Sequence, residues 1–108
     1  MTRSLRFSEW AGAMRLLGSA LAQFARGKQH ESDDALRELI KQHTDDSAFQ
    51  IAEACAYRRE ADLAFQWLER AYKRHAVELC QVRWDPLLRN LHGDARWQAF
   101  VERMGLAD

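Results

Sequence analysis

The chain resembles itself at a spacing of 32 residues, and this internal repeat limits the folds that it can adopt. When residues 13–44 are set against residues 45–76, six positions are identical. The identical pairs are Ala20 with Ala52, Ala22 with Ala54, Arg26 with Arg58, Leu36 with Leu68, Lys41 with Lys73, and His43 with His75. Large apolar positions also coincide, as for Leu17 and Phe49. A repeat of this length is typical of one supersecondary unit stacked in tandem.

Apolar residues recur at spacings of three and four through most of the chain, which predicts helices and not strands. We expect a first helix that starts after Ser8 as its N-cap, runs toward Arg26 and stops at Gly27. Three more helices are expected at about 31–43, 47–58 and 61–75. The stretch from Thr44 to Ser47 can cap the third helix. The sequence therefore predicts an all-α fold of two helical hairpins.

The segment DPLLRNLHGDARW, residues 85–97, contains two further helix starts. Asp85 as an N-cap with Pro86 at the first helical position predicts a short helical turn. We expect that turn to pack on the fourth helix through Leu87, Leu88 and Leu91. Asp94 is expected to cap a final helix with a C-terminal cap at Gly105 and Leu106. The apolar stripe of that helix consists of Trp97, Phe100, Val101 and Met104.

The two hairpins resemble the tetratricopeptide repeat, a helix-turn-helix unit of about 34 residues. In the second copy, the large, small and contact positions of the first helix are filled by Ile51, Ala52 and Cys55. Its second helix has Ala64, Leu68 and Ala71 at the matching positions, and the first copy matches more loosely. The glycine that is usual between the two helices is present as Gly27 and is replaced by Arg59.

The stretch AFQIAEACAYRREADLAFQWLERAY, followed by DPLLRNLHGDARWQAFVERMGL, is similar to the C-terminal tetratricopeptide segments of bacterial regulatory proteins. This resemblance implies a tetratricopeptide-like superhelix in a single domain, residues 1–108. Its parts are hairpins at 8–43 and 47–75 and a degenerate capping hairpin at 77–107. A repeat stack needs such a cap over its last apolar face. The resemblance implies protein–protein interaction as a scaffold or adaptor, and no enzymatic activity.

Charge and composition narrow the classes of partner. Sixteen basic and 16 acidic residues balance, so we expect neither nucleic acid nor a membrane as partner. Glu9 and Arg15 interrupt the apolar run near the N-terminus, which argues against a signal peptide or membrane span, so we expect a cytoplasmic location. Cys55 and Cys80 lie in apolar runs and are interpreted as reduced, structural cysteines. No histidine or cysteine spacing fits a metal site, and no cofactor is expected. We interpret Arg58-Arg59 as a solvated helix end and the four tryptophans as core residues, among which Trp67, beside the inward positions of its helix, could remain partly exposed.

The resemblance places a partner-binding groove on the concave face, lined by the first helix of each hairpin. The expected groove residues are Leu17, Leu21, Ala25, Phe49, Glu53 and Tyr57. An apolar, aromatic groove with one carboxylate suits an amphipathic helix or a hydrophobic peptide. One alternative is a homo-oligomerisation module or the C-terminal tail of a larger regulatory protein. A second alternative, of a different class, is a small enzyme or a nucleic-acid binder.

Overall fold

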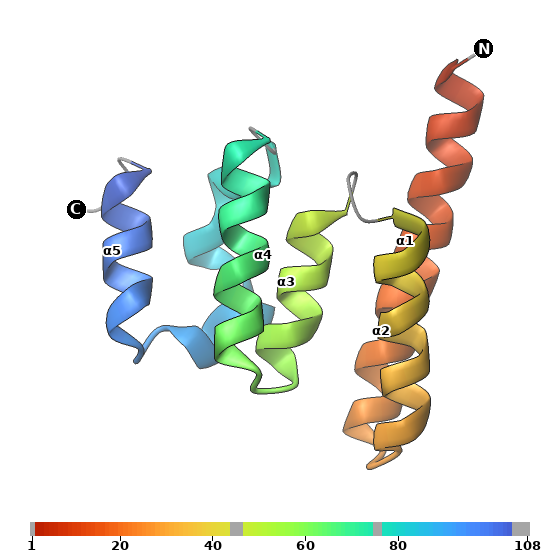
Figure 1. The fold of residues 1–108 in the computed structure, drawn as a ribbon, viewed down its shortest axis with the longest axis horizontal. Coiled ribbons are helices and arrows are strands. Elements are labelled where there is room, and N and C mark those ends of the chain that lie inside the picture. The colour runs from red at the N-terminus through yellow and green to blue at the C-terminus, as the bar shows by residue number, and fades with distance from the viewer. Residues whose placement is uncertain (1, 44–46, 75–76, 105–108) are drawn as a thin grey trace.

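The computed structural model describes residues 2–43, 47–74 and 77–104, and within these ranges the chain is helical, with turns and no strand (Figure 1). The elements in chain order are α1 (Thr2–Ala25), α2 (Gln29–His43), α3 (Ala48–Tyr57), α4 (Ala61–Lys73), η1 (Val77–Trp84), η2 (Pro86–Leu91) and α5 (Ala95–Arg103), where η marks a 3₁₀ helix. The all-α prediction is confirmed for the described residues.

One predicted helix start and one predicted capping bond differ from the structure. The first helix begins at Thr2, so Ser8 lies inside it and does not cap it. Residues 2–7 contain neither glycine nor proline, so no backbone feature stops the helix at that point. Ser47 does stand at the N-cap of α3, but its side chain makes no capping hydrogen bond. Thr44, Asp45 and Asp46 lie outside the described residues.

The same turn closes both helical hairpins. After α1, the amides of Gly27 and Lys28 donate to carbonyls of the last helical turn, at 3.0 and 2.8 Å. After α3, the amides of Arg59 and Glu60 do the same, at 3.0 and 2.9 Å. This is the Schellman motif, which requires a left-handed residue after the helix. Gly27 has φ 80° and Arg59 has φ 65°, so an arginine takes the conformation that favours glycine.

A buried arginine joins the first hairpin to the second. The side chain of Arg58, which follows α3, is only 4% exposed. Its guanidinium pairs with Asp33 of α2, donates to the Ser32 hydroxyl at 3.4 Å, and lies 5.8 Å from the ring centroid of Phe24 in α1. The prediction of a solvated helix end is therefore wrong for Arg58, although Arg59 is exposed. The guanidinium is buried because α1 and α2 cover the end of α3.

The C-terminal elements pack against the second hairpin. Asp85 caps η2 through a 2.9 Å bond from the Leu87 amide, and Asp94 caps α5 through a 2.9 Å bond from the Arg96 amide, as predicted. The predicted packing of η2 on the fourth helix is wrong, because η2 packs mainly on α3. Its Asn90 side chain donates to the Ala56 carbonyl at 3.0 Å. The predicted cap at Gly105 and Leu106 lies outside the described residues.

The helices form a flat molecule of 39 × 37 × 19 Å. A thickness of 19 Å corresponds to about two layers of helices, since packed helices lie about 8–10 Å apart. One continuous core runs between the layers and includes the predicted stripe residues Trp97, Phe100 and Val101 of α5. Met104 packs against the edge of this core. The α5 and α1 helices lie at opposite ends of the long axis of the molecule (Figure 1).

Candidate interaction surfaces

The structure brings the first helices of the two hairpins together, but it buries part of the predicted groove. Phe49 is 3% exposed and Leu17 is 8% exposed, and both belong to the core between α1 and α3. Leu21 packs partly buried against that core, whereas Ala25 is exposed. Glu53 and Tyr57 are half-buried on α3. Phe49 and Leu17 therefore contribute to folding, and a charged residue at position 49 would disrupt the core.

Aromatic residues line the open part of this face. Tyr57 and Phe24 meet edge to face, with their ring centroids 5.9 Å apart, and both are half-buried. Glu53 lies one helical turn before Tyr57, so both side chains project from the same side of α3. Phe24 was not among the predicted groove residues. It lies three residues after Leu21, and this helical spacing is the sequence signal that places both on one side of α1. The surface thus runs from α1 across α3.

Trp84, at the end of η1, is 75% exposed and is the most exposed large apolar side chain among the described residues. It borders a hollow of about 210 Å³ together with Glu53, Asp85 and Pro86. The prediction that the tryptophans lie in the core is wrong for Trp84. It holds for Trp97 and for Trp67, which is only 9% exposed, whereas the side chain of Trp10 lies outside those that the structure describes. Charged neighbours on both sides, Arg83 and Asp85, are the sequence signal that separates Trp84 from an apolar stripe.

We name the residues Phe24, Glu53, Tyr57, Trp84, Asp85 and Pro86 the α3 face. The α3 face extends from α1 and α3, where the groove was predicted, to the exposed tryptophan of η1. Glu53 connects the two parts, because it borders the Trp84 hollow and lies on the same side of α3 as Tyr57, which contacts Phe24. The unpredicted part is the contribution of the C-terminal segment. That segment was expected to act only as a cap.

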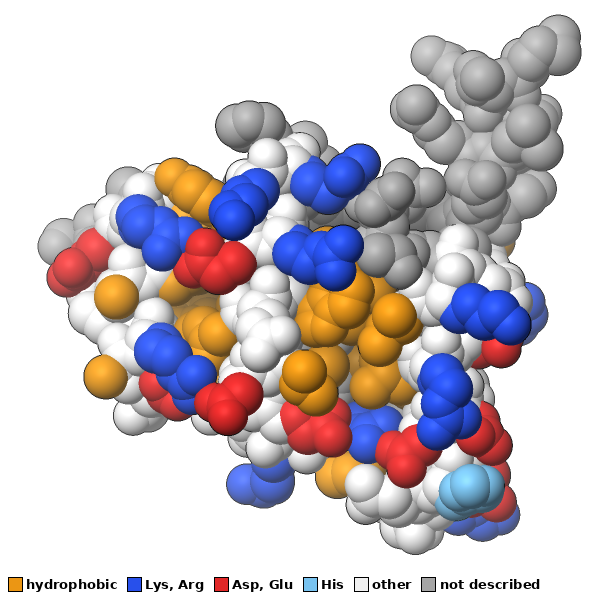
Figure 2. Space-filling view, in the orientation of Figure 1, with side chains coloured by type: hydrophobic (Ala, Val, Ile, Leu, Met, Phe, Trp, Pro, Cys, Tyr) orange, Lys and Arg blue, Asp and Glu red, His pale blue; other side chains and the backbone are white. Residues whose placement is uncertain are grey.

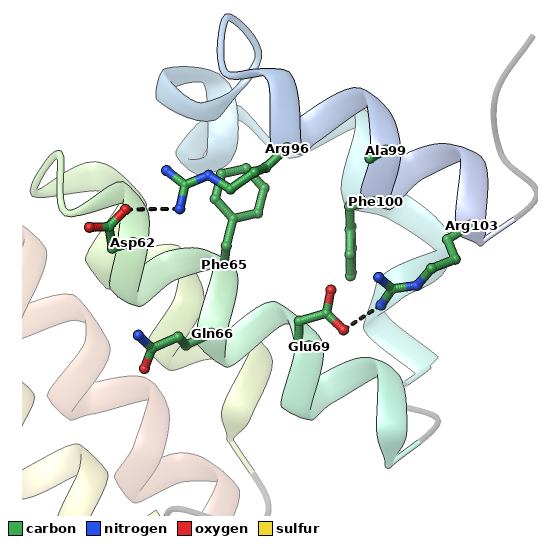
Figure 3. Close-up of a pocket in the computed structure, with 8 residues that line it drawn as sticks. All are labelled: Asp62, Phe65, Gln66, Glu69, Arg96, Ala99, Phe100 and Arg103. Carbon is green, nitrogen blue, oxygen red and sulfur yellow. Dashed lines mark hydrogen bonds and ion pairs between the residues drawn. The ribbon is translucent and has the colours of Figure 1, made fainter.

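A second hollow lies between α4 and α5 (Figure 3). Its volume is about 410 Å³, and Phe65, Ala99 and Phe100 are among its lining residues. Arg96 of α5 donates to Asp62 of α4 at 2.8 Å, and Arg103 of α5 pairs with Glu69 of α4. On the molecular surface, this hollow is bordered by basic and acidic side chains, and further apolar side chains gather between α3 and α2 (Figure 2).

The polar rim of the α4–α5 hollow is already paired within the chain. The Arg96 guanidinium also donates to both oxygens of Asp94, at 3.0 and 2.9 Å, and lies 4.8 Å from the Phe65 ring centroid. The Arg103 guanidinium lies 5.1 Å from the Tyr72 ring centroid. The hydrogen bonds from Arg96 lower the pKa of Asp94 to about 2, and they raise the pKa of Arg96 in turn. The hydrogen bond to Glu69 raises the pKa of Arg103. A ligand in this hollow would meet a rim whose charged groups already pair with one another.

Reactive and metal-binding groups are sparse in the described part of the chain. Burial, followed by the nearby Glu60 carboxylate, raises the pKa of the Cys55 thiol to about 12, so this cysteine stays protonated at neutral pH. Among the described residues, no group of three or more His, Cys, Asp or Glu side chains could hold a metal ion. The same residues include no helix with the length and apolar character of a membrane span.

Comparisons with known proteins assign no family. The chain matches no protein-family profile, no curated protein and no solved structure at a significant level.

Proposed function

We propose that the protein is a tetratricopeptide-like interaction module that binds a partner polypeptide on the α3 face. The observation that carries the proposal is the exposure of Trp84. An indole that is 75% exposed keeps a large apolar area in water, and tryptophan is among the residues that contribute most to protein–protein interfaces. Its position beside Glu53, next to the Phe24–Tyr57 pair, extends this area into a surface that crosses several elements.

Contacts at a spacing of 34 residues support the tetratricopeptide-like arrangement. Ala56 bonds to Asn90, Asp62 to Arg96, and Glu69 to Arg103, and each pair is 34 residues apart. Such a constant offset is expected when the C-terminal segment is a third copy of the unit, shifted by one repeat length of about 34 residues. The two Schellman turns at Gly27 and Arg59 give the first two copies an offset of 32 residues.

The α3 face suits a partner better than the α4–α5 hollow does. Both arginines of the hollow already bond to carboxylates and cover aromatic rings. On the α3 face, by contrast, the indole remains mostly in contact with water. Binding there would bury the exposed apolar area of the indole.

Site-specific photo-crosslinking tests the proposed face. A photoreactive phenylalanine analogue at position 84 is expected to crosslink a discrete partner in cells of the source organism. The same analogue at Leu63, which is 43% exposed on α4, is the matched control for an exposed apolar position and is expected to crosslink it weakly. The substitution Trp84→Ala should abolish co-purification of that partner, whereas Leu63→Ala should preserve it. Equal crosslinking at both positions, or co-purification unaffected by Trp84→Ala, would contradict the proposal.

A further inference from the structure

The first and second hairpins are separate packing units. The α1 helix packs mainly on α2, and α3 packs mainly on α4, whereas fewer contacts cross from one hairpin to the other. In tandem-repeat proteins, each unit and each interface between units contributes its own free energy. The interface between the hairpins is therefore the place where this molecule is expected to open without complete unfolding.

Four polar residues lie at this interface, and we name Ser32, Asp33, Arg58 and Glu60 the inter-hairpin cluster. Arg58 and Glu60 both belong to the turn between α3 and α4, so their 3.3 Å contact stays within the second hairpin. The bonds from Arg58 to Ser32 and Asp33 of α2, by contrast, cross the interface. The Ser32 hydroxyl in turn donates to the Ala20 carbonyl of α1 at 2.8 Å. Asp33 thus supplies the carboxylate that connects the guanidinium to the first hairpin.

The charges of the cluster pair at the cost of their hydration. The side chain of Arg58 is 4% exposed, and those of Asp33 and Glu60 are each 34% exposed. When the hairpins separate, the guanidinium regains water, which offsets much of the attraction within a buried ion pair. The complete cluster therefore adds little net free energy to the packed state. Loss of the Asp33 charge would leave a buried guanidinium with one carboxylate fewer, and this opposes packing of the hairpins.

The same interface assembles part of the α3 face. Phe24 comes from the first hairpin and Tyr57 from the second, and their ring centroids are 5.9 Å apart. The guanidinium of Arg58, the residue after Tyr57, lies 5.8 Å from the centroid of the same Phe24 ring. The aromatic pair and the inter-hairpin cluster thus share Phe24. Separation of the hairpins would remove this ring from the α3 face.

We propose that packing of the first hairpin on the second regulates the α3 face, with the Asp33–Arg58 pair as the controlling contact. This inference rests on the proposed interaction function and concerns the regulation of the same face. With the hairpins packed, Phe24 and Tyr57 present one joined aromatic surface to a partner, and with the hairpins separated this surface is divided. Because a ligand favours the state that it binds more tightly, a partner on the α3 face should in turn stabilise the packed state.

Fluorine NMR of the chain labelled with 3-fluorotyrosine tests this inference. Tyr57 and Tyr72 are the two tyrosines of the sequence, so the spectrum contains two signals, and Tyr72→Phe assigns them by removing one. Tyr57 contacts Phe24 across the hairpin interface. Tyr72 contacts Phe100 of α5, with the ring centroids 6.1 Å apart. The Tyr57 signal therefore reports the packing of the hairpins, and the Tyr72 signal serves as the internal reference.

Two neighbouring aspartates of α2 provide matched variants. Asp33 pairs with Arg58 across the interface, whereas Asp34 is exposed and pairs with Arg37 at 2.9 Å within α2. In Asp33→Asn, the Tyr57 signal should move toward its position in the urea-unfolded chain, while the reference signal stays in place. Asp34→Asn should leave both signals unchanged. An unchanged Tyr57 signal in Asp33→Asn, or movement of both signals together, would overturn the inference.

Crosslinking from position 84 separates this inference from the proposed function. Asp33→Asn should reduce crosslinking of the partner, and Asp34→Asn should preserve it. If crosslinking depends on position 84 but is equal in the two aspartate variants, only the inferred regulation falls. If crosslinking does not depend on position 84, the proposed function falls, whatever the Tyr57 signal shows.

Discussion

At the residue scale, the backbone of Arg59 adopts a conformation that its side chain opposes. Its φ of 65° places the β-carbon close to the following carbonyl, at a cost of about 1–2 kcal/mol relative to a right-handed residue. The equivalent turn of the first hairpin has Gly27, which avoids this cost. The Schellman hydrogen bonds are formed in both turns, so the hairpin geometry overrides the local preference of arginine.

We therefore predict that Arg59→Gly stabilises the protein by about 0.5–1 kcal/mol, because relief of the left-handed strain exceeds the added entropy of the unfolded chain. Gly27→Ala is the matched control and should destabilise by about 1 kcal/mol. A β-carbon at Gly27 would meet no atom within 4 Å, so its effect comes from the backbone alone. Urea unfolding of both variants measures these changes. Destabilisation by Arg59→Gly would contradict the assigned conformation.

Arg58 gives a second prediction at this scale. Its removal would leave Asp33 and Ser32 without their guanidinium partner and open a cavity between the hairpins. We expect Arg58→Ala to lower the free energy of unfolding by about 3 kcal/mol. Arg26 occupies the equivalent position of the first copy and is exposed, so Arg26→Ala should change stability by less than about 0.5 kcal/mol. Similar losses in both variants, measured by thermal unfolding, would show that the Arg58 contacts do not join the hairpins.

At the element scale, α5 depends on its N-cap and on side-chain contacts with α4. Asp94 accepts from the backbone amide and the guanidinium of Arg96, and these bonds lower its pKa to about 2. The ordinary pKa of an aspartate in an unfolded chain is about 4. Since the folded-state pKa is the lower of the two, the Asp94 contribution to stability is fully present above about pH 4. It is lost as the pH falls through about 2.

We predict that protection of the α5 amides from hydrogen exchange decreases between about pH 4 and pH 2, relative to the protection of the α3 amides. In Asp94→Asn, which cannot titrate but can still cap, this pH dependence of α5 relative to α3 should become smaller. Hydrogen exchange followed by NMR separates the two helices. A pH dependence of the variant equal to that of the original chain would show that another group controls α5.

The sequence predicts the helices better than it predicts which side chains face solvent. Apolar spacing and the aspartate caps locate α2–α5 to within a few residues, because these signals are local. The burial of Arg58 and the exposure of Trp84 follow from contacts between distant segments, and both run against the average behaviour of their residue types. Of the predicted groove residues on α3, Glu53 and Tyr57 are half-buried, whereas Phe49 belongs to the core.

At the scale of the whole molecule, the 12.6 kDa chain has two broad faces on a body only 19 Å thick. If the α3 face binds a polypeptide other than a second copy of this chain, the isolated chain should remain a monomer. We predict a molar mass near 12.6 kDa by light scattering over a wide concentration series. A mass near twice that value, or one that rises with concentration, would instead favour a homo-oligomerisation module. In that case, Trp84→Ala should lower the molar mass of an oligomer formed through the α3 face and leave the mass of an oligomer formed through another surface unchanged.

The link between the hairpins through Arg58 also has a consequence for synthesis on the ribosome. Asp33 and Arg58 are 25 residues apart, and the chain grows at about 5–20 residues per second. For roughly one to five seconds, the nascent first hairpin therefore lacks the arginine that pairs with its aspartate and covers Phe24. During this interval, the hairpin presents an acidic and aromatic edge that chaperones or an incorrect neighbour could occupy. The time between the emergence of Asp33 and that of Arg58 from the ribosome therefore sets how long this edge stays uncovered.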